Sequence, residues 1–253
     1  MELELSKSSF TVFKDTITLL KVINEELTLN IGAEEIVTRG MDPSHVAMVE
    51  VKIKAELFDK YEPGTDESIT VNLSEFAKFL DRVDKDETIK ISYKVAEAKL
   101  LIQTRKGGRR RRFSLPVLEP LIEDVPEPKI VFKSSGRILT ESVERSIKDA
   151  NLVSEYMKIM LNESLLQFDA TGDMGSARNE FDKESDELLE LKAEEEASAN
   201  FTLSYLNDIF GQLKNLADVV TLELTTDMPL KIEAGTNNPN LEITLYLAPM
   251  IGV

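Results

Sequence analysis

Apolar residues recur every three to four positions in four segments of the chain, which predicts four helices that each bury one face. The segments lie around residues 9–23, 73–83, 139–150 and 203–213. Their apolar faces are Phe10, Phe13, Ile17 and Leu20; Phe76, Phe79, Leu80 and Val83; Leu139, Val143, Ile147 and Ala150; and Leu206, Ile209, Phe210 and Leu213.

Short runs of alternating apolar and polar residues predict strands between these helices. The clearest runs are residues 89–93, 220–224, 230–234 and 241–247. Most are too close together for parallel crossovers, which need about a dozen or more residues. The pattern therefore predicts an α+β fold, with antiparallel sheets and two helices per domain laid on one face.

The second half of the chain repeats the first at an offset of about 130 residues, since Leu73–Leu80 (LSEFAKFL) aligns with Leu203–Phe210 (LSYLNDIF). A repeat this long predicts two similar domains, because solenoid repeats have periods of about 20–50 residues. Three prolines mark residues 118–128 as an extended connector. We therefore expect an N-terminal domain at 1–117, the connector at 118–128 and a C-terminal domain at 129–253.

Charge is the most unusual property of the composition. The net charge is −16, which argues against tight phosphate binding. The charge is segregated, however: residues 105–112 hold six cations, and residues 180–196 hold nine carboxylates against two lysines. These runs are either solvated surface or functional patches. With no cysteine, no apolar membrane-length run and no basic N-terminal leader, we expect a soluble, cytoplasmic protein.

Motifs for catalysis and cofactor binding were not found. The sequence contains no glycine-rich phosphate loop, no Gly-X-Ser-X-Gly elbow and no His-Glu-X-X-His motif. Its one histidine, His45, excludes a multi-histidine metal site. The acidic clusters lack the residue order of a calcium loop. We therefore expect no enzymatic activity, no cofactor and no metal.

Residues 41–47 (MDPSHVA) predict a tight turn before a strand, in which Asp42-Pro43 begins the turn and Ser44 can cap it. Together with Tyr246–Pro249 (YLAP) and the apolar, proline-rich connector, this heptapeptide resembles the sliding clamps of archaea and eukaryotes, the proliferating cell nuclear antigen (PCNA) family. The resemblance spans essentially the whole chain. It implies a processivity factor that encircles double-stranded DNA, associated with the nucleoid in a prokaryote, and performs no chemistry.

The same resemblance implies a hydrophobic pocket that binds short peptide segments of DNA polymerase, clamp loader, flap nuclease and ligase. The expected lining is Met41, His45, Val46, Leu121, Ile122, Val125, Pro126, Pro229, Tyr246, Ala248 and Pro249. One departure from the family is Met250, which stands where a basic residue usually follows the Ala-Pro pair.

Cations recur on the predicted helices, either as ordinary solvent-facing residues or as a basic stripe for phosphates; their spacing favours neither. The clamp resemblance implies the stripe, because in that family the helices line a ring around duplex DNA. The residues expected to face DNA are Lys14, Lys21, Lys78, Arg82, Arg145, Lys148 and Lys214.

Ring closure needs a head-to-tail interface between subunits. By resemblance, the strand at 109–117 of one subunit pairs with the strand at 175–183 of the next. The expected interface residues are Arg82, Arg109, Arg110, Arg111, Arg112, Phe113, Glu141, Asp149, Ser176, Arg178, Glu180 and Asp182. We expect a trimer and leave open whether it is a homotrimer or a heterotrimer with related chains. The rival hypotheses are a two-domain protein-binding adaptor without DNA and, last, an enzyme acting through its carboxylates.

Overall fold

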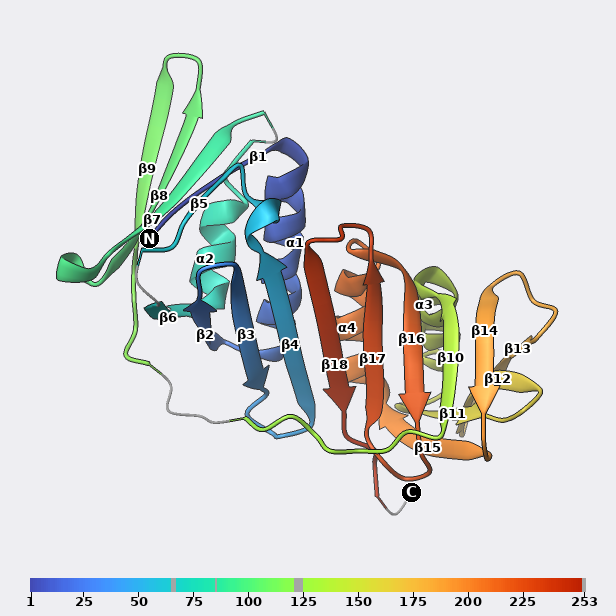
Figure 1. Cartoon of the computed structure of the whole chain (residues 1–253). Helices are drawn as coiled ribbons and strands as arrows, with labels where there is room; N and C mark the ends of the chain where they lie inside the picture. Colours follow the sequence, from blue (N-terminus) through green and yellow to red (C-terminus); the bar gives the residue numbers. More distant parts are fainter. Residues whose placement is uncertain (65–66, 85, 121–124, 252–253) are drawn as a thin grey trace. The chain divides into compact units, whose positions relative to one another are not determined.

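The computed structural model describes residues 1–64, 67–84, 86–120 and 125–251. The chain divides into two compact units (Figure 1). Unit 1 comprises Met1–Met41, Val49–Val125 and Asn238–Ile243, and unit 2 comprises Asp42–Met48, Pro126–Asn237 and Thr244–Val253. The division passes through two strands, β4 (Ala47–Lys54) and β18 (Leu241–Leu247).

Unit 1 contains two antiparallel sets of strands and two α-helices. One set has the order β5-β1-β7-β8-β9 and the other β4-β3-β2-β6. The bounds are β1 Glu2–Ser6, β2 Glu26–Ile31, β3 Glu35–Met41, β5 Lys60–Glu62, β6 Glu67–Asn72, β7 Thr88–Lys94, β8 Lys99–Lys106 and β9 Arg109–Pro116. The helices are α1 (Lys7–Ile23) and α2 (Leu73–Leu80), with short 3₁₀ turns η1 (Ala55–Leu57) and η2 (Val95–Glu97).

Unit 2 has the same organisation. Its strands follow the orders β14-β10-β16-β17 and β13-β12-β11-β15. The bounds are β10 Ser134–Leu139, β11 Tyr156–Leu161, β12 Leu165–Gly172, β13 Gly175–Asp182, β14 Leu188–Ala193, β15 Ala197–Thr202, β16 Ala217–Leu224 and β17 Leu230–Thr236. The helices are α3 (Thr140–Ala150) and α4 (Leu203–Leu213). The α+β prediction is confirmed.

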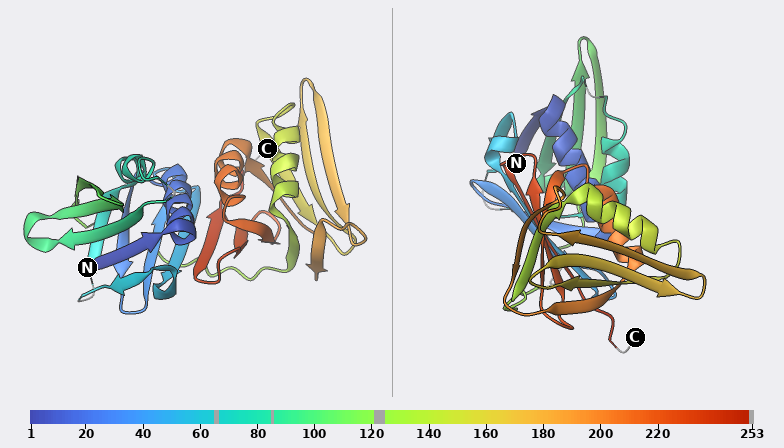
Figure 2. Two further views of the ribbon diagram at one scale, coloured as in Figure 1. Left: turned by 90° about the horizontal axis from the view of Figure 1, so that it is seen from above. Right: turned by 90° about the vertical axis from the view of Figure 1, so that its right-hand side faces the viewer.

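The four predicted helices are all present, and the sequence repeat is a structural repeat. The aligned octapeptides begin α2 at Leu73 and α4 at Leu203. Within each unit the two helices pack against one another, and Figure 2 shows each pair side by side. The predicted faces are buried except at Phe79 and Leu139, which are half-buried. Val83 lies beyond the end of α2, and Leu139 is the last residue of β10. Among the described residues, no helix is long and apolar enough to span a membrane.

Aromatic packing joins the helices of unit 1 to its strands. The Phe13 ring of α1 lies edge-on to Phe76 of α2 and to Phe58, with ring centroids 6.1 and 5.9 Å apart. Helix α2 also contacts β6 of one sheet and β9 of the other. These buried rings close the core on the helix side, since aromatic pairs add to the free energy of apolar burial.

The strands β9 and β13 each lie at the edge of a sheet. On β9, the exposed Arg110 and Arg112 alternate with the half-buried Arg111 and Phe113. Arg111 forms an ion pair with Glu87, whose side chain is 1% exposed. Burial alone would raise the pKa of Glu87, but the Asp84 amide and the Arg111 guanidinium lower it below the ordinary glutamate value. Arg111 is thus a structural residue of unit 1.

We predict that Arg111→Ala lowers the free energy of unfolding by about 2–3 kcal/mol, because it leaves a buried carboxylate without its cation. Urea unfolding at neutral pH measures the change. The matched variant Arg110→Ala removes an exposed neighbour and is expected to change stability by less than about 0.5 kcal/mol. Equal effects of the two substitutions would contradict the structural role of Arg111.

Candidate functional site

The turn at residues 42–47 is organised by one carboxylate within unit 2. Asp42 accepts hydrogen bonds from the backbone amides of Val46 (2.6 Å), Ala47 (2.6 Å) and Ser44 (3.0 Å). A fourth comes from the Tyr205 hydroxyl on α4, at 2.8 Å. Asp42, and not Ser44 as the sequence suggested, is therefore the capping residue, because its two oxygens reach three amides of the turn.

His45 has a left-handed backbone, with a φ of 57°. Such a conformation is unfavourable for a residue with a Cβ atom, and surrounding hydrogen bonds must hold it. The His45 amide donates to the Asp42 carbonyl at 2.9 Å, which closes the turn around it. Its side chain is exposed. The geometry places the imidazole on the surface of the turn, where it is available for contact with a partner.

Hydrogen bonding also shifts the pKa values of the turn. Burial alone would raise the pKa of Asp42, but the amides of Ala47, Val46 and Ser44 and the Tyr205 hydroxyl lower it below the usual aspartate value. Burial, together with the Asp42 charge, raises the pKa of Tyr205. The pair therefore stays as a charged acceptor and a neutral donor at neutral pH.

The C-terminal segment is joined to this turn by the backbone. The Ala248 amide donates to the Val46 carbonyl at 2.8 Å, and the Met250 amide donates to the Asn200 carbonyl at 2.8 Å. Val46 and Ala248, 202 positions apart in the sequence numbering, thus become neighbours. This brings together two of the three segments that the sequence analysis assigned to one pocket.

The other predicted lining residues are distributed as follows. In unit 2, Tyr246 is buried on β18, Pro249 and Pro229 are half-buried, and Pro126 is exposed. Met41 and Val125 are half-buried residues of unit 1. Leu121 and Ile122 lie outside the described residues. Burial raises the pKa of the Tyr246 hydroxyl.

Tyr205 is a site residue that periodicity did not identify. It belongs to the α4 octapeptide that repeats α2, and it stands where the first half has Glu75. That departure from the repeat is the available signal, because a bulky phenol replaces a charged surface residue at a matching position. The structure explains the change, since only a side chain of that length carries a hydroxyl from α4 to Asp42.

Most cations on the helices have carboxylate partners. Lys14 of α1 pairs with Asp81 at 2.9 Å, and Lys214 at the end of α4 pairs with Glu144 of α3 at 2.6 Å. The remaining pairs are Lys78–Glu75, Arg145–Glu141 and Lys148–Glu144. Within the described ranges, Lys21 and Arg82 have no ion pair. The helix surfaces are therefore mixed in charge rather than strongly basic.

Exposed residues of opposite charge occupy the two sheet edges. On β13, Arg178 pairs with Asp169 at 2.7 Å and with Glu180 at 3.7 Å, and Glu180 and Asp182 are exposed along the same edge. Two other predicted interface residues have partners within the chain, since Glu141 pairs with Arg145 and Asp149 accepts from Asn179. Ser176 and Phe113 lie on β13 and β9.

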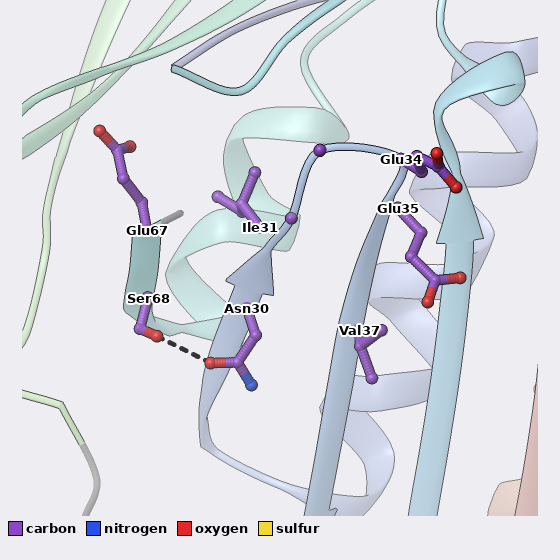
Figure 3. A pocket seen from close by; sticks show the side chains of 9 residues that line it. Asn30, Ile31, Glu34, Glu35, Val37, Glu67 and Ser68 are labelled. Carbon is purple, nitrogen blue, oxygen red and sulfur yellow. Dashed lines mark hydrogen bonds between the residues drawn. The ribbon is translucent and has the colours of Figure 1, made fainter. Parts of the chain in front are cut away.

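A cavity of about 660 Å³ lies at the β2–β3 end of unit 1 (Figure 3). Its lining includes Glu34, Glu35 and Glu67, and the Ser68 hydroxyl donates to Asn30 at 2.8 Å. Glu67 pairs with the N-terminal amino group at 3.7 Å. Across the part of the chain that the structure describes, no group of three histidine or acidic side chains is placed to hold a metal ion.

Both halves of the chain match models of one protein family. The chain matches the model of the proliferating cell nuclear antigen N-terminal domain over residues 1–119 and that of the C-terminal domain over residues 128–250. The chain therefore belongs to the proliferating cell nuclear antigen family, as the sequence analysis predicted.

Similar proteins cover nearly the full length. Proteins named DNA polymerase sliding clamp from Nitrosopumilus maritimus and Cenarchaeum symbiosum are 31% and 32% identical, and each match covers 94% of both chains. The crystal structure of PCNA from Thermococcus kodakaraensis matches with a TM-score of 0.89 and 25% identity, covering 98% of this chain and 99% of that one. A PCNA2–PCNA3 complex from Sulfolobus tokodaii, at 22% identity and a TM-score of 0.86, shares the fold.

We predict that Asp42→Asn destabilises unit 2 by about 1–3 kcal/mol at neutral pH, because an amide cannot accept the same four hydrogen bonds as a carboxylate. Tyr205→Phe, which removes one of the four, should cost about 1 kcal/mol. Urea unfolding measures both.

The lowered pKa of Asp42 fixes the pH dependence of this difference. A carboxylate whose folded pKa is depressed contributes stability above its unfolded value of about 3.9, and that contribution is lost as the pH falls through the folded value. The gap in stability between wild type and Asp42→Asn should therefore shrink in acid. A gap independent of pH down to full protonation would contradict the assignment.

Proposed function

We propose that this chain is a subunit of a DNA sliding clamp, a ring that encircles double-stranded DNA and tethers replication and repair enzymes to it. The observation that carries the proposal is the full-length similarity to proteins named DNA polymerase sliding clamp, over 94% of both chains. The subunit is organised as a clamp domain at 1–117, a connector at 118–128 and a clamp domain at 129–253. As a replication factor it acts at the nucleoid.

The helix surfaces suit contact with DNA that must slide. Phosphate contacts carry no sequence information, and each cation that binds a phosphate displaces counterions and adds affinity. Pairing Lys14 with Asp81 and Lys214 with Glu144 keeps that affinity low. Retention then depends on the ring rather than on tight binding. In this proposal the protein tethers enzymes and performs no reaction itself.

The turn at 42–47 and the Ala248–Pro249 segment of unit 2 supply the docking site in this proposal, and the clamp resemblance adds residues of the connector to it. Clamp-binding segments of polymerase, clamp loader, flap nuclease and ligase insert aliphatic and aromatic anchors there. The hydrogen bond from Ala248 to Val46 supports this site, because it holds two walls at a fixed separation. A pre-organised pocket binds more tightly, since less conformational freedom is lost on binding.

Assembly uses the two exposed strand edges. Unpaired edges favour pairing with another chain, and β9 and β13 are both terminal strands of their sheets. Arg110 and Arg112 on β9 are exposed, as are Glu180 and Asp182 on β13. Antiparallel pairing of β9 with β13 of the next subunit matches these charges head to tail. Three subunits close the ring, as copies of this chain or with related chains.

We predict that this protein raises the processivity of a cognate DNA polymerase on primed circular DNA in the presence of clamp loader and ATP. The measurement is the product length after a single binding event. Val46→Asp is expected to abolish the gain and peptide binding while leaving assembly intact, because it places a charge in the apolar pocket.

Neutralising Lys14, Lys78, Arg82 and Lys214 together tests the DNA surface separately, and is expected to weaken loading on DNA without reducing peptide affinity. Unchanged polymerase product length with wild-type protein would reject the sliding-clamp function. Normal peptide binding by Val46→Asp would reject only the docking pocket.

We predict that assembly is salt-sensitive and depends on the edge charges. Arg110→Glu combined with Arg112→Glu should shift light scattering toward monomer, because like charges would then face one another across the interface. Mixing this variant with Glu180→Lys plus Asp182→Lys should restore one of the interfaces and recover larger species. If the purified chain scatters as a monomer at low salt, the mixture with related subunits decides between a heterotrimer and no ring.

A further inference from the structure

Among its described residues, the connector is hydrogen-bonded to unit 1 at Leu118 and at Val125. At its beginning, the Leu118 amide donates to the Thr70 carbonyl of β6 at 2.8 Å. Near its end, the carbonyl of Val125 accepts from Nη1 of Arg39 at 3.1 Å. The first contact is backbone to backbone, whereas the second depends on a single side chain.

The Arg39 side chain is itself held in place. Its Nε donates to Glu50 Oε2 at 2.6 Å, and Nη2 also donates to that oxygen. Arg39 lies on β3 and Glu50 on the adjacent β4. The guanidinium therefore uses two nitrogens on the strand carboxylate and a third on the connector, which suits its planar fork of donors.

A cavity of about 210 Å³ lies beside this contact. Its lining includes Asn24, Arg39 and Gly40, together with Pro120 and Val125 of the connector. Asn24 is 8% exposed, and its Oδ1 has no hydrogen-bond partner among the described residues. At the edge of this cavity, the directional hydrogen bond from Arg39 helps to set the position of Val125.

We propose that Arg39 is a positioning residue for partner docking, which fixes the end of the connector at Val125 through a guanidinium anchored on Glu50. The inference rests on the proposed function, because the connector is a wall of the docking pocket there. Arg39 itself need not touch the partner. Holding one wall before the partner arrives reduces the entropy lost on binding and so raises affinity.

The neighbouring Lys52 supplies a matched control. Its Nζ lies 3.5 Å from the other oxygen of Glu50, and its side chain is 39% exposed, compared with 31% for Arg39. Lys52→Ala thus removes a cation from the same carboxylate, whereas among the described residues it is Arg39 that contacts the connector. Any effect specific to Arg39→Ala is then an effect on the connector.

The test uses the assembled full-length chain and two measurements. Hydrogen–deuterium exchange follows the amides of residues 118–128, and calorimetry measures the affinity for a synthetic peptide with aliphatic and aromatic anchors on one helical turn. Arg39→Ala should speed exchange in the connector and weaken peptide binding about five- to tenfold, the range expected for the loss of an ordinary intramolecular hydrogen bond. Lys52→Ala should change affinity less than about twofold.

Arg39→Lys keeps the positive charge but loses the planar guanidinium with its several donors. We expect its connector exchange rate and its peptide affinity to lie between those of wild type and Arg39→Ala. Arg39→Lys is also the variant to compare if Arg39→Ala lowers the melting temperature. If Arg39 only stabilised the fold through its charge, the lysine would restore stability, connector exchange and peptide affinity together. Equal connector exchange and equal affinity in Arg39→Ala and Lys52→Ala would overturn the proposal. If wild-type protein binds no such peptide, the docking function fails, whereas the exchange data still decide whether Arg39 holds the connector.

Discussion

The turn at residues 42–47 depends on the ability of one carboxylate to accept several hydrogen bonds. Asp42 collects three amides of a turn and the hydroxyl of Tyr205, and the turn in turn receives the Ala248 amide. A buried charge is stable only when its lone pairs are satisfied, and the turn and α4, two separate parts of unit 2, satisfy those of Asp42. The left-handed backbone of His45 follows from the same constraint, since the chain must fold tightly enough to aim its amides at one side chain.

The charged residues of this acidic protein are distributed unevenly over its surface. A net charge of −16 would repel nucleic acid if it were spread evenly. Most cations on the helices are instead paired with carboxylates, and exposed arginines stand on β9. Arg111 differs from its neighbours in the same run, because it neutralises a buried glutamate within its own unit. Residues that look equivalent in the sequence therefore divide into structural and surface roles according to which side of the strand they occupy.

Helical periodicity predicted all four helices because each buries a continuous apolar stripe, and the repeat at Leu73 and Leu203 indicated the duplicated organisation. Strand β9 carries four consecutive arginines and has no alternation of its own, so only the family resemblance pointed to it. The hydrogen bond between Tyr205 and Asp42 joins residues 163 positions apart, and that between Arg39 and Val125 joins residues 86 apart. Neither hydrogen bond produces a periodic pattern in the sequence, because each depends on a single side chain that contacts a residue distant in the sequence. The capping role was assigned to Ser44 because a short hydroxyl side chain suits a turn, yet the carboxylate beside it reaches more amides.

The arginine run on β9 also affects which pairs of strand edges repel one another when two copies of the chain meet. An open strand edge usually invites an identical edge from another copy. Two β9 strands meeting along their arginine-bearing halves would set guanidinium against guanidinium, and two β13 strands would set Glu180 and Asp182 against their own kind. Back-to-back dimers are therefore disfavoured at both edges, while the mixed pairing is attractive. In the proposed assembly, these charges favour the pairing of unlike edges over symmetric contacts between identical edges.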